Sequence, residues 1–225
     1  LVDKQGEITE LFSNICHEGS IVHPIEGMEY PFHYRNKVIS PYVRGKKMPV
    51  DKNAAPRTKK GRAGAKPSRK FEQRFEIVSG MYEARSHRVI PTDSCLIENQ
   101  TAKGIILAIP DLMRQFKLEP YHEDTGKGFL RHALVRVGHT SGEVLVTLVT
   151  NEKVFPRSKD FSRALVTRCP AITSIVQNMN TRQTNVILCE EESTLYGPGF
   201  ILDTLCGLSF RISSQSFYHV NSVPT

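Results

Sequence analysis

Short apolar runs rich in β-branched residues constrain the fold of this 225-residue chain more than any other feature. Such runs are typical of β-strands. They cover residues 130–137, 143–150, 172–177, 185–189 and 208–212. Turn residues such as Ser141-Gly142 separate them, which favours antiparallel pairing between neighbours. One helical pattern, at Ser158–Thr167, lies between the second and third runs.

Two further segments have the apolar spacing of helices. Ile8–Cys16 repeats apolar side chains three and four residues apart, and Thr101–Lys117 follows the same period. Pro110 lies inside the second segment and is expected to break or kink that helix, because proline has no backbone N–H. Strands and helices together predict an α+β fold, a largely antiparallel sheet with a few covering helices.

One strongly basic segment lies between two more predicted strands, Tyr34–Tyr42 and Phe75–Arg88. From Arg44 to Arg74 there are twelve Lys and Arg residues against two acidic ones, whereas the whole chain has a net charge of +7. The remainder is therefore slightly acidic, and this distribution favours a polyanion as partner. The segment, at about 45–72, is predicted to be a flexible insertion in a hairpin. The alternative is a solvated loop without a partner.

Composition argues against several other classes of protein. No apolar run approaches the roughly 20 residues that cross a bilayer, and the first residues lack a secretory pattern. The five cysteines are an odd number without a CxxC pair, which fits neither a disulfide framework nor a self-contained zinc site. We expect a cytoplasmic protein with reduced thiols and no membrane contact.

Two polar clusters lie on predicted strands. Tyr34–Lys37 offers cations to phosphates and an asparagine to a base edge, but charges on an edge strand also prevent aggregation. Leu130–His132, with Arg136, alternates polar and apolar residues, so that Arg and His emerge on one sheet face. An ordinary solvated face explains the second cluster equally well.

Two further clusters lie outside the strands. Asn178–Thr181 and Thr184-Asn185 form a polar stretch that can present amide groups to a ligand, although a simple turn explains it better. Ser216–Asn221 combines two aromatic rings with His and Asn, the composition of a pocket that stacks a flat base. A half-buried packing segment is the alternative for this cluster.

These clusters belong to an ordered series of motifs that covers nearly the whole chain except the basic segment. The series is YRNK at 34–37, MYEARSHRVI at 81–90, GFLRHALVR at 128–136, SGEVLVTLV at 141–149, SIVQNMNTRQTNVIL at 174–188, LYGPGFILDTLCGLSFRIS at 195–213 and SFYHVN at 216–221. It resembles the RNA uracil-5-methyltransferase family, and most closely the members that act on bacterial 23S ribosomal RNA.

The resemblance implies the central part of a longer enzyme. Family members carry a β-barrel domain and iron-sulfur cysteines before this region, and a class I Rossmann-like methyltransferase domain after it. We expect residues 1–33 to be a helical lead-in, 34–213 the RNA-handling domain, and 214–225 the start of a truncated methyltransferase domain. The enzyme would transfer a methyl group from S-adenosylmethionine to C5 of a flipped-out uridine after a cysteine attacks C6. That cysteine lies outside this chain, so we expect no catalytic residue here and no activity of the fragment alone.

The same resemblance assigns roles to particular side chains. RNA contacts are expected from Arg35, Asn36, Lys37, Arg131, His132 and Arg136, and stacking near the target base from Phe217. His219 stands where the family usually has a glutamine associated with the S-adenosylmethionine pocket, and it lacks the paired geometry of an amide. Cys95 stands where the family has the fourth ligand of a 4Fe–4S cluster, which requires about four thiolates.

Ribosomal RNA is the expected partner, with transfer RNA as the alternative, and the chain is expected to be a monomer. A different class of function remains open at this point: a free-standing RNA-binding or ribosome-associated module. A scaffold domain whose basic segment binds nothing specific is a third interpretation.

Overall fold

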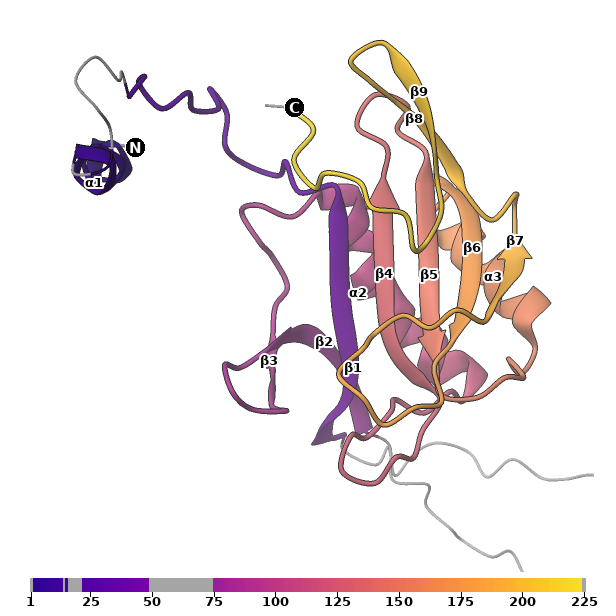
Figure 1. Ribbon diagram of the computed structural model, residues 1–225. Helices are drawn as coiled ribbons and strands as arrows, with labels where there is room; N and C mark the ends of the chain where they lie inside the picture. Colours follow the sequence, from indigo (N-terminus) through magenta and orange to yellow (C-terminus); the bar gives the residue numbers. More distant parts are fainter. Residues whose placement is uncertain (1, 14, 16–21, 49–74, 224–225) are drawn as a thin grey trace, which may run out of the picture.

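The computed structural model describes residues 2–13, 15, 22–48 and 75–223 (Figure 1). The elements are α1 (Val2–Ser13), β1 (Lys37–Lys47), β2 (Phe75–Tyr82), β3 (Val89–Pro91), α2 (Gln100–Phe116), β4 (Leu130–Val137), β5 (Val144–Thr150), α3 (Ser158–Arg168), β6 (Ile172–Met179), β7 (Glu192–Tyr196), β8 (Ile201–Leu205) and β9 (Leu208–Ile212). Most of the predicted basic insertion, residues 49–72, lies outside the described part. Its first residues, up to Lys47, belong to β1.

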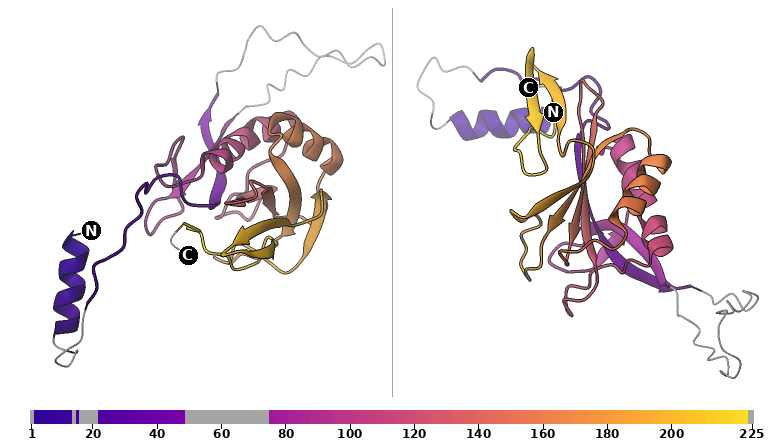
Figure 2. Two further views of the ribbon diagram at one scale, coloured as in Figure 1. Left: turned by 90° about the horizontal axis from the view of Figure 1, so that it is seen from above. Right: turned by 90° about the vertical axis from the view of Figure 1, so that its right-hand side faces the viewer.

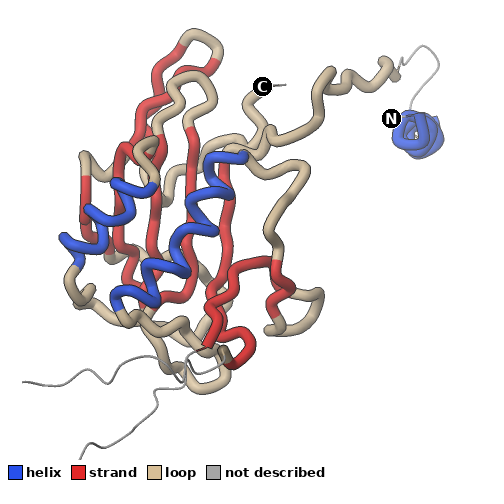
Figure 3. Tube along the Cα trace, turned by 180° about the vertical axis from the view of Figure 1, so that it is seen from behind, coloured by secondary structure: helices blue, strands red, loops and turns tan. Residues whose placement is uncertain are grey.

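A seven-stranded sheet with the order β3-β2-β1-β4-β5-β6-β7 forms the body of the molecule. Helices α2 and α3 cover one face, while the opposite face is crossed by the β6–β7 connection and by the segment after β9 (Figures 1, 2 and 3). Neighbouring strands are antiparallel except β5 and β6, which are parallel. The exception follows from α3, because a helix that connects two strands in a crossover returns the chain in the same direction.

The main core lies between the sheet and the two helices. Along β5, Val144, Val146 and Leu148 point toward the helices and are fully buried there. Leu145 points to the opposite face, where it packs with β6 and with the β8–β9 hairpin in a second, smaller core. A strand that is buried on both faces has a continuous apolar sequence, which explains why the run at 144–150 lacks alternation.

Helix α2 continues through Pro110 without interruption, so the predicted break at this residue is wrong. Proline cannot donate to the carbonyl four residues earlier, which is that of Ile106. The hydroxyl of Tyr42, on β1, donates to this carbonyl instead, at 3.0 Å. Both side chains are buried, so a partner from the sheet satisfies the carbonyl where water cannot reach it.

A β-bulge in β4 interrupts the alternation of its side chains. Leu130 pairs with Thr150 and His132 pairs with Val149, so Arg131 is an extra residue in this strand. Leu130 and Ala133 both belong to the helix-side core although they are three positions apart, an odd spacing that would place them on opposite faces of a regular strand. An extra residue of this kind re-aims the neighbouring side chains. Arg131 and His132 consequently line one hollow together, instead of pointing to opposite faces.

The strand predicted at residues 185–189 is wrong, because these residues lie in the connection between β6 and β7 and form no strand. The amide of Asn180 donates to the carbonyls of Val186 and Ile187. Asn178 donates to the carbonyl of Cys189 and accepts from its N–H. Side-chain amides therefore take the hydrogen bonds that a neighbouring strand would have made. These asparagines belong to the cluster that the sequence explained best as a turn.

Other predicted element boundaries also differ from those in the structure. The predicted strand 75–88 ends at Tyr82 and returns as β3, and neither β7 nor β8 was predicted. Helix α1 occupies only part of the predicted lead-in, has no buried residue, and lies apart from the sheet (Figure 1). Residues 22–33 are neither helix nor strand. Among the described helices, none combines the length and apolar character needed to cross a membrane.

Candidate nucleic-acid interface

The motif that precedes β1 and the motif that follows β9 meet at one end of the sheet. Asn36 donates its backbone N–H to the carbonyl of Val220, at 2.9 Å. Its side-chain amide donates to the carbonyl of His219 at 2.8 Å and to Ser222 Oγ at 2.9 Å. From β4, Arg136 donates to the carbonyls of Ser214 and Ser216. We call this meeting of residues 34–37, Arg136 and 213–222 the terminal junction.

Within the terminal junction, buried and exposed residues have different roles. Asn36 and Arg136 are only 6% exposed and bind main-chain atoms, so they fix the C-terminal segment to the sheet. Phe217 is 87% exposed, and the ring of His219 lies edge-on to it with 5.3 Å between ring centroids. Burial, and then the charges of Arg136 and Arg35, lower the pKa of Lys37. Mutual repulsion of these cations would be relieved by a bound anion.

A buried carboxylate holds the β8–β9 hairpin beside this junction. Asp203 accepts the backbone N–H groups of His139, Thr140 and Ser141 at 2.8 to 3.0 Å. It also accepts the hydroxyl of Tyr218 at 3.0 Å. Burial alone would raise the pKa of Asp203, but these four hydrogen bonds hold it below its ordinary value. The hairpin, the β4–β5 turn and the aromatic segment are therefore positioned by one side chain, which the sequence did not indicate.

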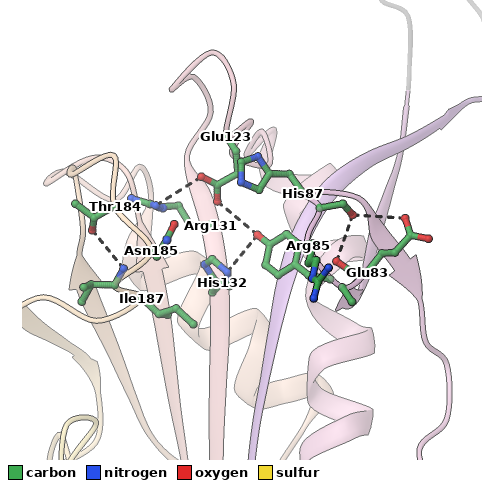
Figure 4. Close-up of a pocket in the computed structure, with 13 residues that line it drawn as sticks. Glu83, Arg85, His87, Glu123, Arg131, His132, Thr184, Asn185 and Ile187 are labelled. Carbon is green, nitrogen blue, oxygen red and sulfur yellow. Dashed lines mark hydrogen bonds and ion pairs between the residues drawn. The ribbon is translucent and has the colours of Figure 1, made fainter.

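At the other end of β4 lies a hollow of about 640 Å³, which we call the Tyr82 hollow (Figure 4). Its walls come from the β2–β3 turn, β4, and the β6–β7 connection. The lining residues are Tyr82, Glu83, Ala84, Arg85, Ser86, His87, Glu123, Arg131, His132, Thr184, Asn185, Val186 and Ile187. The hollow lies within the size range of small-ligand sites in proteins.

Arg131 is a fixed part of the wall rather than a mobile cation. Its guanidinium lies 4.3 Å from the ring centroid of Tyr121, and it donates to the carbonyls of Asn180 and Arg182 at 3.0 and 2.6 Å. Glu123 lies 4.0 Å away and partly balances its charge. Arg131 thereby also anchors the β6–β7 connection over the hollow.

His132 and Tyr82 give the hollow neutral polar groups. Burial, and then the charge of Arg131, lower the pKa of His132 to about 4, so its ring is uncharged at neutral pH. Burial, and then Glu123, raise the pKa of Tyr82 to about 12. The Tyr82 hydroxyl lies 3.4 Å from both His132 Nε2 and Glu123 Oε1. His132 Nδ1 and Arg131 Nε are buried and have no hydrogen-bond partner among the described residues.

The structure thus divides the predicted RNA-contacting residues between two places. Arg35, Asn36, Lys37, Arg136 and Phe217 gather at the terminal junction. Arg131 and His132 lie in the Tyr82 hollow. At roughly 3.3 Å per residue, Arg131 is about 16 Å from Arg136 along β4. Arg131 and Phe217 therefore belong to two different places, and the predicted RNA contacts do not form one continuous cluster.

Sequence reasoning did not single out Tyr82 or Glu123. Tyr82 lies within the motif at 81–90 that carried the resemblance, which was the available signal. Glu123 carries no such signal, because only the bulge and the chain reversal before β4 bring it to Arg131.

Of the two predicted cofactor residues, Cys95 lies outside both places and His219 belongs to the terminal junction. Cys95 is half-buried between β3 and α2. Among the described residues, no three His, Cys, Asp or Glu side chains gather as metal ligands, so these residues do not by themselves form a cluster site around Cys95. The ring of His219 is exposed, while its carbonyl accepts the hydrogen bond from Asn36.

Sequence comparison identifies the class of protein. The chain is 33% identical over 224 residues to an uncharacterized RNA methyltransferase of Oceanobacillus iheyensis, which covers 99% of this chain and 43% of that protein. It is 36% identical over 199 residues to an uncharacterized RNA methyltransferase of Clostridium acetobutylicum, covering 88% of this chain and 37% of that protein. No protein-family model matches the chain. The chain spans less than half the length of these relatives, and it is homologous to RNA methyltransferases.

A solved structure shares the fold of this chain. The fold is similar to the crystal structure of Pyrococcus abyssi tRNA (uracil-54, C5)-methyltransferase in complex with S-adenosyl-L-homocysteine, with a TM-score of 0.59 and 20% identity. The match covers 87% of this chain and 39% of that chain. The chain belongs to a family of RNA methyltransferases, as the names of these relatives indicate.

Proposed function

We propose that this chain is the RNA-handling part of an enzyme that methylates C5 of a specific uridine in 23S ribosomal RNA, in the cytoplasm and as a monomer. S-adenosylmethionine would supply the methyl group. We further propose that the Rossmann-like domain and the cysteine nucleophile belong to sequence outside this chain, so that the fragment alone is inactive. The names of the relatives and the motif series support this proposal.

The observation that carries the proposal is the terminal junction. Two motifs separated by about 180 residues in the sequence meet there through the hydrogen bonds of Asn36 and Arg136. They place cationic Arg35 and Lys37 on the same end of the sheet as Phe217. Cations that contact phosphates position an RNA backbone, and an exposed aromatic ring stacks on an unpaired base.

Each part of the junction has its own share in this function. Arg35 and Lys37 would hold phosphates beside the target nucleotide. Phe217 would stack on a neighbouring base, or occupy the space left when the uridine is flipped out of its stack. Buried Asn36 and Arg136 would keep the aromatic segment in place without touching RNA, which replaces their predicted role as direct contacts.

RNA binding by the purified chain tests this proposal. Substituting Arg35 and Lys37 together by Ala should weaken binding to a 23S ribosomal RNA stem-loop and lower the salt slope by roughly 0.9 per lost phosphate contact. The matched control is the pair Lys159→Ala and Arg163→Ala, which removes the same charge from exposed residues of α3 on the helix-covered side. Equal losses in both pairs would contradict a specific site at the junction.

Base stacking is tested separately. Phe217→Ala should cost roughly 1–3 kcal/mol of binding free energy if one base stacks on this ring. The salt slope should not change, because no charge is removed. Stronger binding to a transfer RNA than to the ribosomal stem-loop would replace 23S RNA as the proposed substrate.

A further inference from the structure

The Tyr82 hollow has features of a ligand site that the terminal junction does not explain. Arg131 and His132 are only 3% and 4% exposed. Because water cannot reach them, it matters that Arg131 Nε and His132 Nδ1 have no hydrogen-bond partner among the described residues. Unsatisfied buried polar atoms are rare because each costs free energy. Figure 4 shows both side chains in the hollow with Glu123 beside them. Tyr82 also lines the hollow, and its hydroxyl lies 3.4 Å from His132 Nε2.

The charges in the hollow do not favour a phosphate. The guanidinium of Arg131 is already engaged by two carbonyls, by the Tyr121 ring and by Glu123. His132 is uncharged, and the carboxylates of Glu83 and Glu123 balance the cations of Arg85 and Arg131, so the lining has no net positive charge to attract an anion. A neutral ligand with a flat apolar face and polar edges is the better match, because Tyr82 and His132 offer rings while Glu123 and Asn185 offer hydrogen-bonding groups.

We infer that the Tyr82 hollow binds one unpaired nucleobase of the substrate RNA, distinct from the target uridine, and that it favours guanine. This inference rests on the proposed function, because the ligand is taken to be part of the RNA held at the terminal junction. Guanine carries two adjacent N–H donors on its Watson–Crick edge, and a carboxylate accepts both together. Glu123 is the acceptor, and its side chain is 29% exposed.

The distance between the two places suits this arrangement. Arg131 and Arg136 are about 16 Å apart along one strand, using roughly 3.3 Å per residue. An RNA backbone can cover that distance with a few nucleotides, so one single-stranded loop can place its target at the junction and another base in the hollow. RNA recognition commonly uses splayed bases of this kind.

Binding of short RNAs to the whole chain tests the inference. The probes are a fluorescent oligouridine, the same strand with one central guanosine, and the same strand with inosine at that position. Guanosine should tighten binding roughly tenfold or more over oligouridine, because a bidentate pair discriminates to about this degree. Inosine lacks the 2-amino donor and should lose most of the gain.

Glu123→Gln should abolish the guanosine preference while binding to oligouridine stays within a few fold. The control is Glu190→Gln, which removes one exposed carboxylate outside the lining of the hollow and should keep the preference. If Glu123→Gln does not fold, Tyr82→Phe provides the second test. It removes the hydroxyl that contacts Glu123 and His132 and should reduce the guanosine preference alone.

The outcomes separate this inference from the proposed function. Tight binding to all three RNAs without a guanosine preference overturns the base site and leaves the RNA-handling role standing. Failure to bind any RNA overturns both. Inorganic phosphate that shifts the NMR signals of the His132 ring, when guanosine does not, would make the hollow an anion site and overturn the inference.

Discussion

The contact between Tyr42 and the carbonyl of Ile106 gives a quantitative test of how α2 tolerates Pro110. Tyr42→Phe removes the hydroxyl and leaves a buried carbonyl without a donor, since the proline has no N–H to offer. An unsatisfied buried polar group costs about 1–3 kcal/mol. The free energy of unfolding should fall by that amount, measured from urea titrations followed by circular dichroism with an unchanged m-value.

A double-mutant cycle combines Tyr42→Phe with Pro110→Ala. The second substitution restores a backbone N–H four residues after Ile106. In that background the carbonyl has a helical donor, so Tyr42→Phe should cost clearly less. The expected coupling between the two positions is about 1–2 kcal/mol, within the range for residues that share a partner. Tyr30→Phe, at a residue that is 67% exposed, is the control and should change stability by less than about 0.5 kcal/mol. An equal cost of Tyr42→Phe in both backgrounds would refute this account of the helix.

Five further outcomes are expected. The pKa of Asp203 is lowered in the folded state, so its contribution to stability is present above the unfolded pKa and is lost as pH falls through the folded value; Asp203→Asn should flatten the decline of stability below about pH 4. Arg136→Ala should increase hydrogen exchange in residues 213–222, whereas Arg35→Ala should not, because of these two arginines Arg136 donates to carbonyls of that segment and Arg35 donates to Lys37. Deleting residues 49–72 should lower the salt slope of RNA binding without unfolding the chain, and an unchanged slope would mean that the basic segment binds no RNA. The chain alone should transfer no label from S-adenosylmethionine to RNA, and its visible spectrum should show no iron-sulfur absorbance; 5-methyluridine or bound iron and sulfide would contradict these two expectations.

Much of the local structure could be predicted because it depends on neighbouring residues. The strand at 130–137 was predicted with the boundaries that the structure has, and the helices at 101–117 and 158–167 are close to those of α2 and α3. The spacing of apolar residues and the content of β-branched residues depend only on residues that are near in sequence. Helices and strands can therefore be predicted from them without knowledge of the tertiary structure. The ordered motifs likewise sufficed to indicate the family, since they required no knowledge of contacts.

The sequence did not reveal features that depend on long-range pairing. The extra residue at Arg131 exists only relative to its partner strand, and a bulge is a property of register between two strands. The segment 185–189 has a strand-like composition, but the side-chain amides of Asn178 and Asn180 donate to its backbone carbonyls in place of a neighbouring strand. Pro110 lies within a continuous helix because a hydroxyl from another element reaches Ile106.

The same distinction applies to function. The sequence by itself determined the family and the residue types that suit RNA. Only the tertiary structure decided which of those residues lie together. Asn36 and Arg136 are buried and support the terminal junction. Arg131 and His132 line a separate hollow with Tyr82 and Glu123. Burial and hydrogen-bond partners decide whether a cation is free to bind phosphate, and both are set by elements far apart in the chain.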